Sequence, residues 1–195
     1  MNLKEWIKTA EHPEIIRSGR RTLSLEIRSD GRLIVRAPYA ASQTEIRRFV
    51  RNNHAWIIRK IDEIEKRMKQ AEKAEPISAE ECRELARQAV KELPPRLEAF
   101  AKVMGVSYGR VKIRNQKTRW GSCSVKGNLN FNCLLMLMPR EIQDYVLVHE
   151  LAHLREMNHS PRFWAIVEGV LPDYRERRKW LKQNGGVIME RMRNG

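Results

Sequence analysis

The sequence predicts an α+β fold in which helices dominate and short strands form small sheets. Short apolar runs alternate with polar residues at a period of two, as half-buried strands do. Longer segments repeat apolar residues every three to four positions, and two of them open with the capping box of an α-helix. Ten glycines and eight prolines among 195 residues are too few for a collagen-like or Pro-rich chain. A hydrophobic content of 42% is enough to build a core.

The N-terminal portion, residues 1–77, is expected to hold a β-hairpin and a long helix. Residues 22–38 should form the hairpin, because alternating apolar residues flank Asp30-Gly31, a dipeptide typical of tight turns. The sequence Ser-Gln-Thr-Glu at 42–45 is a capping box. The apolar stripe that follows it predicts one long helix up to Met68.

The C-terminal portion, residues 78–195, opens with a second capping box at 78–81. Pro94-Pro95 should break or kink the helix that starts there, and Gly105 should cap the helical piece that follows. The two portions are expected to make one continuous compact unit. Strands are expected at residues 111–114, 120–123 and 128–137, with a turn at Lys126-Gly127.

Two helices are expected after these strands. Pro139 suits the first turn of a helix that should end near Asn158. Ser160-Pro161 supplies an N-cap and a first-turn proline for a last helix, which Pro172 should interrupt before it resumes.

Several protein classes are excluded by what the sequence lacks. No run approaches the roughly 20 apolar residues that a membrane helix needs, so no membrane partner is expected. The first residues have neither the apolar segment nor the cleavage site of a secretion signal. Cys82, Cys123 and Cys133 are odd in number and lack CxxC spacing, which argues against a disulfide framework and a cysteine zinc cluster. A cytoplasmic location is therefore expected.

The net charge of +14 and the isoelectric point near 10.1 favour a polyanionic partner, because cationic surfaces release counterions from phosphate backbones. Between Glu98 and Glu141 the sequence has no acidic residue. A solvated basic surface that keeps the protein in solution explains the excess equally well. The basic residues of this stretch are Lys102, Arg110, Lys112, Arg114, Lys117, Arg119, Lys126 and Arg140.

The segment His149-Glu150-Leu-Ala-His153 has the spacing of a zinc site on a helix. At about 100° per residue the two histidines lie about 40° apart on one face and one turn apart, so both imidazoles can reach one ion. Glu150 lies about 100° round from His149, where it can act as general base on a metal-bound water without being a ligand. Three protein ligands leave a fourth position for that water, whose pKa falls towards about 7.

His159 is the favoured third ligand, because it follows His153 at the spacing of the HExxHxxGxxH motif. Glu156 stands where that motif has glycine, so Asn158 is expected to make the turn in a left-handed conformation. A downstream carboxylate is the rival ligand, as in sites built from two histidines and one glutamate. The two candidates for it are Glu168 and Glu176.

The segments HELAHLREMNHSPRFW (149–164) and KTRWGSCS (117–124) resemble the YgjP-like family of small zincin-fold metallopeptidases, relatives of the SprT and Spartan-type proteases. This resemblance implies a zincin-like core, with a mixed sheet beside the HExxH helix, zinc on the three histidines and Glu150 as catalytic base. It also implies that the strand at Arg119–Cys123 lies beside that helix, where strands of zincins can hold an extended peptide by strand addition.

Residues on and near that strand are the candidates for substrate binding. Trp120 either lines a cleft or packs in the core. Tyr145, Tyr174 and Arg119 are candidate donors to a developing oxyanion. The expected substrate-binding set is Arg119, Trp120, Gly121, Ser122, Arg114 and Lys117.

The sequence thus predicts a zinc-dependent hydrolase, first of all a metallopeptidase, acting on a polypeptide or another anionic substrate. One rival is a metal-dependent nucleotide phosphohydrolase that uses the basic residues for phosphates. The other is a basic nucleic-acid-binding protein whose histidines are structural, although the sequence has no recognisable nucleic-acid-reading motif.

Overall fold

The computed structural model describes residues 13–28 and 32–194. The chain divides into two compact units, Met1–Lys69 and Gln70–Gly195, and each is described by itself. This division lies slightly earlier in the chain than the boundary after residue 77 that the sequence predicts. That the two portions make one continuous unit stays a prediction.

The N-terminal unit contains a three-stranded mixed sheet with strand order β1-β3-β2. β2 and β3 pair antiparallel and confirm the hairpin, whose turn at Asp30-Gly31 lies outside the described residues. β1 was not expected; it pairs parallel to β3, with Glu14 opposite Ile34. The strands are β1 (Glu14–Ser18), β2 (Ser24–Ile27) and β3 (Leu33–Pro38).

Two helices follow, where the sequence predicts one. The capping box is present: Ser42 Oγ accepts from Glu45 N at 3.2 Å, and Glu45 Oε2 accepts from Ser42 N at 2.7 Å. The prediction of a single long helix is wrong, because the helix is interrupted at Asn53. The Asn53 amide donates to the Phe49 carbonyl at 2.8 Å and so competes with the backbone for the last turn. The helices are α2 (Gln43–Asn52) and α3 (His54–Glu72).

The C-terminal unit contains a second mixed sheet, with strand order β4-β6-β5. β4 runs parallel to β6 and β5 antiparallel to it. Gly127, at φ 71°, makes the expected turn between β5 and β6. The strand expected to reach residue 137 ends at Asn132, whose side chain accepts from Leu134 N and starts a 3₁₀ helix instead. These elements are β4 (Val111–Arg114), β5 (Gly121–Cys123), β6 (Leu129–Asn132) and η1 (Cys133–Leu137).

The helix α4 (Ala79–Met104) runs through Pro94-Pro95 without a break, so of the two expected effects the break is wrong and the kink stays a prediction. Each proline removes one donor, and the carbonyls left without a helical partner belong to Val90 and Lys91, both exposed, where water can reach them. Burial holds the helix together on both sides of the prolines, since Leu93 and Leu97 are fully buried. Gly105 caps the end at φ 61°, as expected.

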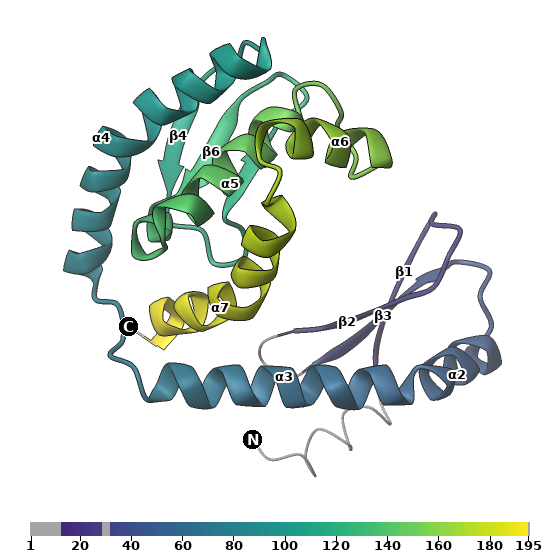
Figure 1. The fold of residues 1–195 in the computed structure, drawn as a ribbon. Helices are drawn as coiled ribbons and strands as arrows, with labels where there is room; N and C mark the ends of the chain where they lie inside the picture. The colour runs from purple at the N-terminus through teal and green to yellow at the C-terminus, as the bar shows by residue number, and fades with distance from the viewer. Residues whose placement is uncertain (1–12, 29–31, 195) are drawn as a thin grey trace. The chain divides into compact units, whose positions relative to one another are not determined.

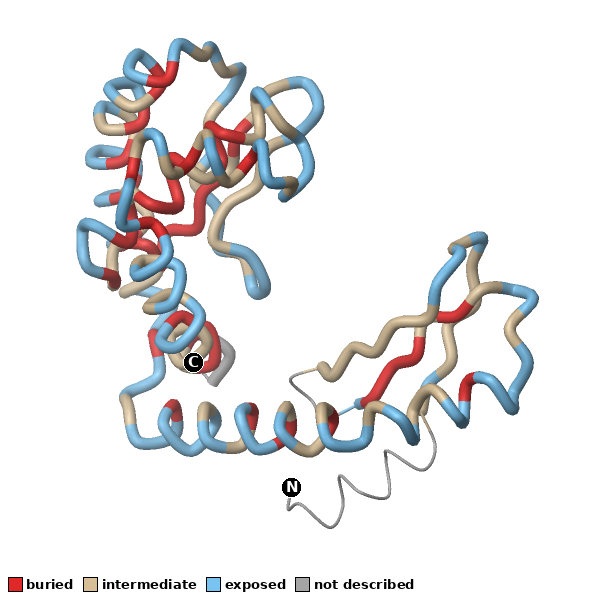
Figure 2. Tube along the Cα trace, turned by 45° about the vertical axis from the view of Figure 1, so that its right-hand side comes forward, coloured by how far each residue is buried: buried red, intermediate tan, exposed pale blue. Residues whose placement is uncertain are grey.

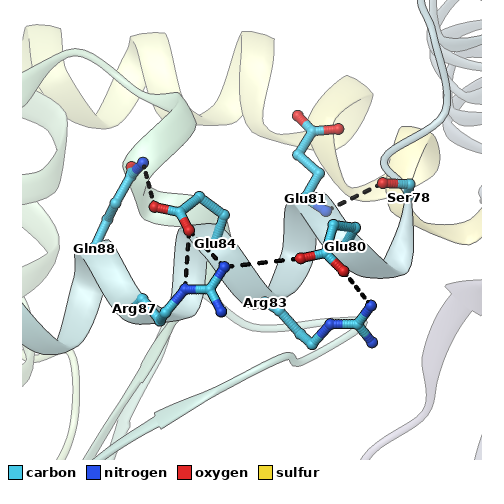
Figure 3. A network of polar contacts seen from close by, with 7 residues as sticks. All are labelled: Ser78, Glu80, Glu81, Arg83, Glu84, Arg87 and Gln88. Atoms are coloured by element: carbon cyan, nitrogen blue, oxygen red, sulfur yellow. Dashed lines mark hydrogen bonds and ion pairs between the residues drawn. The ribbon is translucent and has the colours of Figure 1, made fainter.

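The first turns of α4 are stabilised by local polar contacts, which Figure 3 shows. Ser78 Oγ accepts from Glu81 N at 3.1 Å and caps the helix. Along the exposed face Arg83 pairs with Glu80, and Arg87 pairs with Glu84 at 2.6 Å.

The helix α5 (Arg140–Ala152) is the centre of the C-terminal unit and contacts β5, α4, α6 and α7 (Figure 1). Most of its residues are buried, as are those of β6 (Figure 2). Arg96 of α4 fixes the start of α5, since its guanidinium pairs with Asp144 and donates to the Arg140 carbonyl at 2.9 Å. The last helices are α6 (Pro161–Val170) and α7 (Tyr174–Asn194).

The helix α5 ends at Ala152, so the expected end near Asn158 is wrong. After it the amides of Leu154 and Arg155 bond to carbonyls three residues back, at 3.0 and 3.1 Å, which tightens the chain into a turn. No helix in the described ranges combines the length and apolar content that crossing a membrane requires.

Candidate active site

Three histidines converge at the end of α5. His149 lies in the last turns of α5, His153 caps its C-terminus, and His159 lies in the loop before α6. One ring nitrogen of each lies within 4.8 Å of the others. The Nε2 atoms of His149 and His159 are 3.0 Å apart. The structure therefore brings together the three residues that the sequence singled out as ligands.

The loop from His153 to Ser160 turns the chain so that His159 faces back to α5. The His153 Nδ1 lies 3.1 Å from the Glu156 carbonyl, which fixes the ring and leaves its Nε2 for a ligand. The prediction that Asn158 adopts a left-handed conformation is wrong, since no described residue other than glycine has a positive φ. Its side-chain oxygen instead accepts from Ser160 N at 2.9 Å and makes the turn.

Their surroundings keep the imidazoles of His149 and His153 neutral. Burial, then the neighbouring His153, His159 and Arg178, lower the pKa of His149 from 6.5 to about 3. Burial also lowers the pKa of His153. Neutral imidazole is the form that binds a metal ion, so both rings are ready ligands at neutral pH.

Glu150 is buried beside the histidines, with 6% of its surface exposed. Burial raises the pKa of Glu150 from 4.5 to about 8, against the opposing effect of the Arg119 cation. Gly121 of β5 packs directly on it, since a Cβ at Gly121 would lie 2.7 Å from Glu150 Oε1. β5 therefore lies beside the HExxH helix, as the family resemblance implied.

An aromatic cluster supports the histidines from α6 and α7. Trp164 stacks on His159 with ring centroids 5.6 Å apart and planes at 23°, and Tyr174 stacks on Trp164 at 5.4 Å and 14°. The Arg178 guanidinium lies 4.4 Å from the Trp164 ring. Phe163, fully buried, contacts all three histidine rings. In the sequence only the apolar pattern of α6 pointed to this cluster.

Neither rival carboxylate joins the three histidines among the described residues. Glu168 pairs with Arg175 at 3.2 Å. Glu176 is exposed in the first turn of α7. The geometry thus favours a site of three histidines over one of two histidines and a glutamate.

The expected substrate-binding residues separate into two groups. Arg119 acts electrostatically on Glu150, and Gly121 touches it. Trp120 is half-buried and packs on α7, where a Cβ at Gly185 would lie 3.1 Å from its indole. Ser122 Oγ accepts from the amide of Asn130 at 3.1 Å.

The other group lies away from β5. Arg114 ends β4, which β6 separates from β5. Its side chain lines a cavity of about 420 Å³ together with Cys82 and Ile113, and none of the three histidines lines this cavity. Lys117 is exposed in the loop between β4 and β5. Of the candidate oxyanion donors, Tyr145 is buried with its ring 5.8 Å from that of His149, and burial raises its pKa to about 12.

Asn132 is a positioning residue that the sequence did not reveal. It is fully buried at the end of β6, and its amide donates to the carbonyls of Gln116 and Arg119 at 2.7 and 2.9 Å. Its backbone N–H donates to the Trp120 carbonyl at 2.8 Å. These bonds fix the loop that leads into β5 and so hold Gly121 against Glu150.

The residues present fit a divalent metal ion with an affinity for nitrogen ligands. The donor set is three imidazoles, two of them partly buried, with no carboxylate among them. Three protein ligands and a neighbouring carboxylate that is not a ligand are the arrangement of a catalytic rather than a structural site.

Comparisons with known proteins identify a family that matches the chain and two similar solved structures. The model of the YgjP-like metallopeptidase domain matches residues 21–85 and 79–184. No curated protein matches the chain. Two solved structures are similar over 47% of this chain. They are the metallopeptidase zymogens abylysin of Pyrococcus abyssi (28% identity, 93% of that chain, TM-score 0.42) and jannalysin of Methanocaldococcus jannaschii (17%, 95%, 0.43). The family match covers most of the sequence, and the chain therefore belongs to the YgjP-like family and is a hydrolase of the metallopeptidase type.

Proposed function

We propose that this chain is a zinc-dependent peptidase in which His149, His153 and His159 hold the ion and Glu150 is the general base. The single observation that carries the proposal is the convergence of three histidine ring nitrogens within 4.8 Å beside a buried glutamate. Imidazole ligands suit zinc, and three of them leave one position for water or substrate.

Bound zinc would supply Lewis acidity, which polarises a peptide carbonyl and acidifies a water molecule. Glu150 accepts the proton of the attacking water and returns it to the leaving amine. Burial raises the pKa of Glu150 in the metal-free site, and the charge of a bound zinc would lower it again, so that the carboxylate can accept this proton. Gly121 permits this carboxylate to lie against β5, so that a substrate held along β5 would pass close to it.

The strand β5 supports a peptide substrate. Among the described residues it pairs only with β6, so its other edge can offer N–H and C=O groups to an extended chain. Because Gly121 is on β5 and touches Glu150, a peptide added at this edge would pass the general base. The exposed Arg119 cation next to Glu150 supports a preference for substrates with negative charge.

The expected anionic character of the substrate can be tested separately. Lys112 and Arg114 are exposed on β4, and Lys117 is exposed in the following loop. Replacing all three by Gln should weaken the salt dependence of substrate affinity. Unchanged salt dependence would remove these residues from the substrate site.

The three free cysteines fit the reducing cytoplasm as the place of action.

The proposal is tested by measuring cleavage of an unfolded protein substrate by the wild type and by Glu150→Gln. We expect the wild type to cleave after zinc is supplied and to stop when a chelator removes it. Glu150→Gln should keep its zinc and lose activity by at least about 100-fold, since it lacks the general base. Release of phosphate or pyrophosphate from a nucleotide panel, without cleavage of protein, would instead establish the phosphohydrolase.

A further inference from the structure

The N-terminal unit carries a cationic helix face that the proposed peptidase does not use. Arg47, Arg48 and Arg51 lie within an arc of about 100° on α2. All three are exposed. The opposite side of α2 is apolar, where Ile46 is buried against Val35 of the sheet. The helix thus turns one face to its own core and offers the other to solvent.

These three arginines make no ion pair with any described residue. The acidic residue nearest in sequence, Glu45, is held by its hydrogen bonds to the N-cap Ser42, although the Arg48 charge contributes to lowering its pKa. Arg83 and Arg87 of α4 differ, because each has a glutamate partner on that helix (Figure 3). A face of unpaired guanidinium groups repels itself and is stabilised by an anion with several charges.

An exposed aromatic ring precedes this helix. Tyr39 is 72% exposed, yet its backbone is firmly held. The Arg17 guanidinium donates to the carbonyls of Pro38, Tyr39 and Ala41 at 3.1, 3.0 and 2.7 Å, and the Tyr39 N–H donates to the Ser18 carbonyl at 3.2 Å. A ring presented on a fixed loop is a platform on which a nucleobase can stack at little cost in entropy.

The ring and the cations belong to one end of the unit. The loop that carries Tyr39 leads directly into the N-cap of α2. Arg21 is exposed and has no ion pair with any described residue. It follows the end of β1, whose last residue, Ser18, accepts a hydrogen bond from the Tyr39 N–H. The aromatic ring and the guanidinium groups therefore belong to segments that adjoin one another in this unit.

We propose that this surface, made of Arg21, Tyr39, Arg47, Arg48 and Arg51, binds single-stranded nucleic acid. The guanidinium groups bind phosphates, and Tyr39 stacks on an unpaired base. A duplex keeps its bases inside the stack and cannot use the ring, so single strands are favoured. No residue of the C-terminal unit takes part, and the inference stands apart from the proposed peptidase activity.

The test measures binding of full-length protein to a labelled oligodeoxythymidylate of about 16 nucleotides by fluorescence anisotropy, over a series of salt concentrations. Arg47→Gln/Arg48→Gln/Arg51→Gln should lower affinity at least about tenfold and reduce the slope of log affinity against log salt by about 2. Tyr39→Ala should lower it about fivefold or more, whereas Tyr39→Phe, which keeps the ring, should bind as the wild type does.

The matched control is Lys91→Gln/Lys179→Gln/Lys182→Gln, which removes the same charge from exposed positions of the C-terminal unit that have no part in the proposed substrate site. We expect it to bind within about twofold of the wild type. Equal losses in the two triple variants would overturn the inference, because binding would then follow net charge alone. It would also be overturned by a preference for duplex, by no binding of the wild type, or by equal competition from polyglutamate, which would indicate an acidic protein partner. Circular dichroism of each variant establishes that the fold is kept.

Discussion

Gly121 and Glu150 are in direct contact, and they lie too close together for any side chain at position 121. A Cβ at Gly121 would lie 2.7 Å from both Cγ and Oε1 of Glu150. The two residues come from different elements, the strand β5 and the helix α5, so the glycine sets how closely the strand approaches the general base.

Gly121→Ala should therefore lower peptidase activity far more than it lowers stability. The added methyl must push either Glu150 or β5 aside, and a displacement of about 1 Å at a catalytic group can cost about 100-fold in rate. Steady-state kinetics of the variant measure the effect. Gly169→Ala is the control, because a Cβ there meets nothing within 4 Å. It should keep full activity and gain up to about 1 kcal/mol of stability in its helix. Equal activities of the two variants would contradict this role of Gly121.

Trp164→Ala should weaken metal binding without removing a ligand. The indole stacks on His159 at 5.6 Å, and His159 is exposed, with Phe163 as the other non-histidine ring beside it. Losing an outer-shell partner of this kind costs about 10–100-fold in metal affinity. Competition with a chromophoric chelator measures it, and Trp164→Phe should lose less. Trp180→Ala, a half-buried tryptophan of α7 without a described ring contact to the histidines, is the control and should bind zinc as the wild type does.

Asn132→Asp should destabilise the C-terminal unit. The carboxylate replaces a buried donor that bonds to the Gln116 and Arg119 carbonyls, so both lose their partner and face a negative charge. Each unsatisfied buried group costs about 1–3 kcal/mol, so the free energy of unfolding should fall by about 2–6 kcal/mol. Denaturant unfolding measures it. Asn130→Asp, at a half-buried site, can keep its bond because the Ser122 hydroxyl can donate to the new carboxylate, and it should cost no more than about 1 kcal/mol. A smaller loss for Asn132→Asp than for Asn130→Asp would be contrary to this account.

Glu150→Gln should stabilise the metal-free protein, and the gain should grow with pH. The folded pKa of Glu150, about 8, lies above the ordinary 4.5. Below pH 4.5 both states hold the proton and the carboxyl adds no pH dependence. Between 4.5 and 8 the unfolded state ionises first, so the wild type loses stability as pH rises, while the Gln variant does not. Denaturant unfolding in chelator at pH 4.5 and pH 8 measures the difference. A gain that shrinks with pH would show that Glu150 is ionised in the folded protein.

The sequence predicted the features that neighbouring residues determine. The caps at Ser42, Ser78 and Gly105 are local, and each is where the pattern placed it. The histidine pair also follows from helical geometry alone, because residues four apart share a face. These predictions succeed because each cap, and the histidine pair, is formed by residues close together in the chain.

The features that the sequence missed depend on contacts distant in the chain or on competition between bonds. Asn132 joins a strand end to a loop 13 and 16 residues earlier, and nothing in the pattern marks it. The helix α4 passes through two prolines because burial of Leu93 and Leu97 outweighs the lost hydrogen bonds. At Asn53 a side-chain amide competes with the backbone and divides a helix whose apolar stripe continues.

The most direct test of the central claim is the zinc content of purified protein, measured by elemental analysis in the wild type, His159→Ala and Glu168→Gln. We expect about one zinc per chain in the wild type and in Glu168→Gln, and a large loss in His159→Ala, because His159 completes the ligand set. Zinc retained in His159→Ala and lost in Glu168→Gln would contradict the site of three histidines. A wild type that takes up no zinc would contradict the zinc peptidase itself.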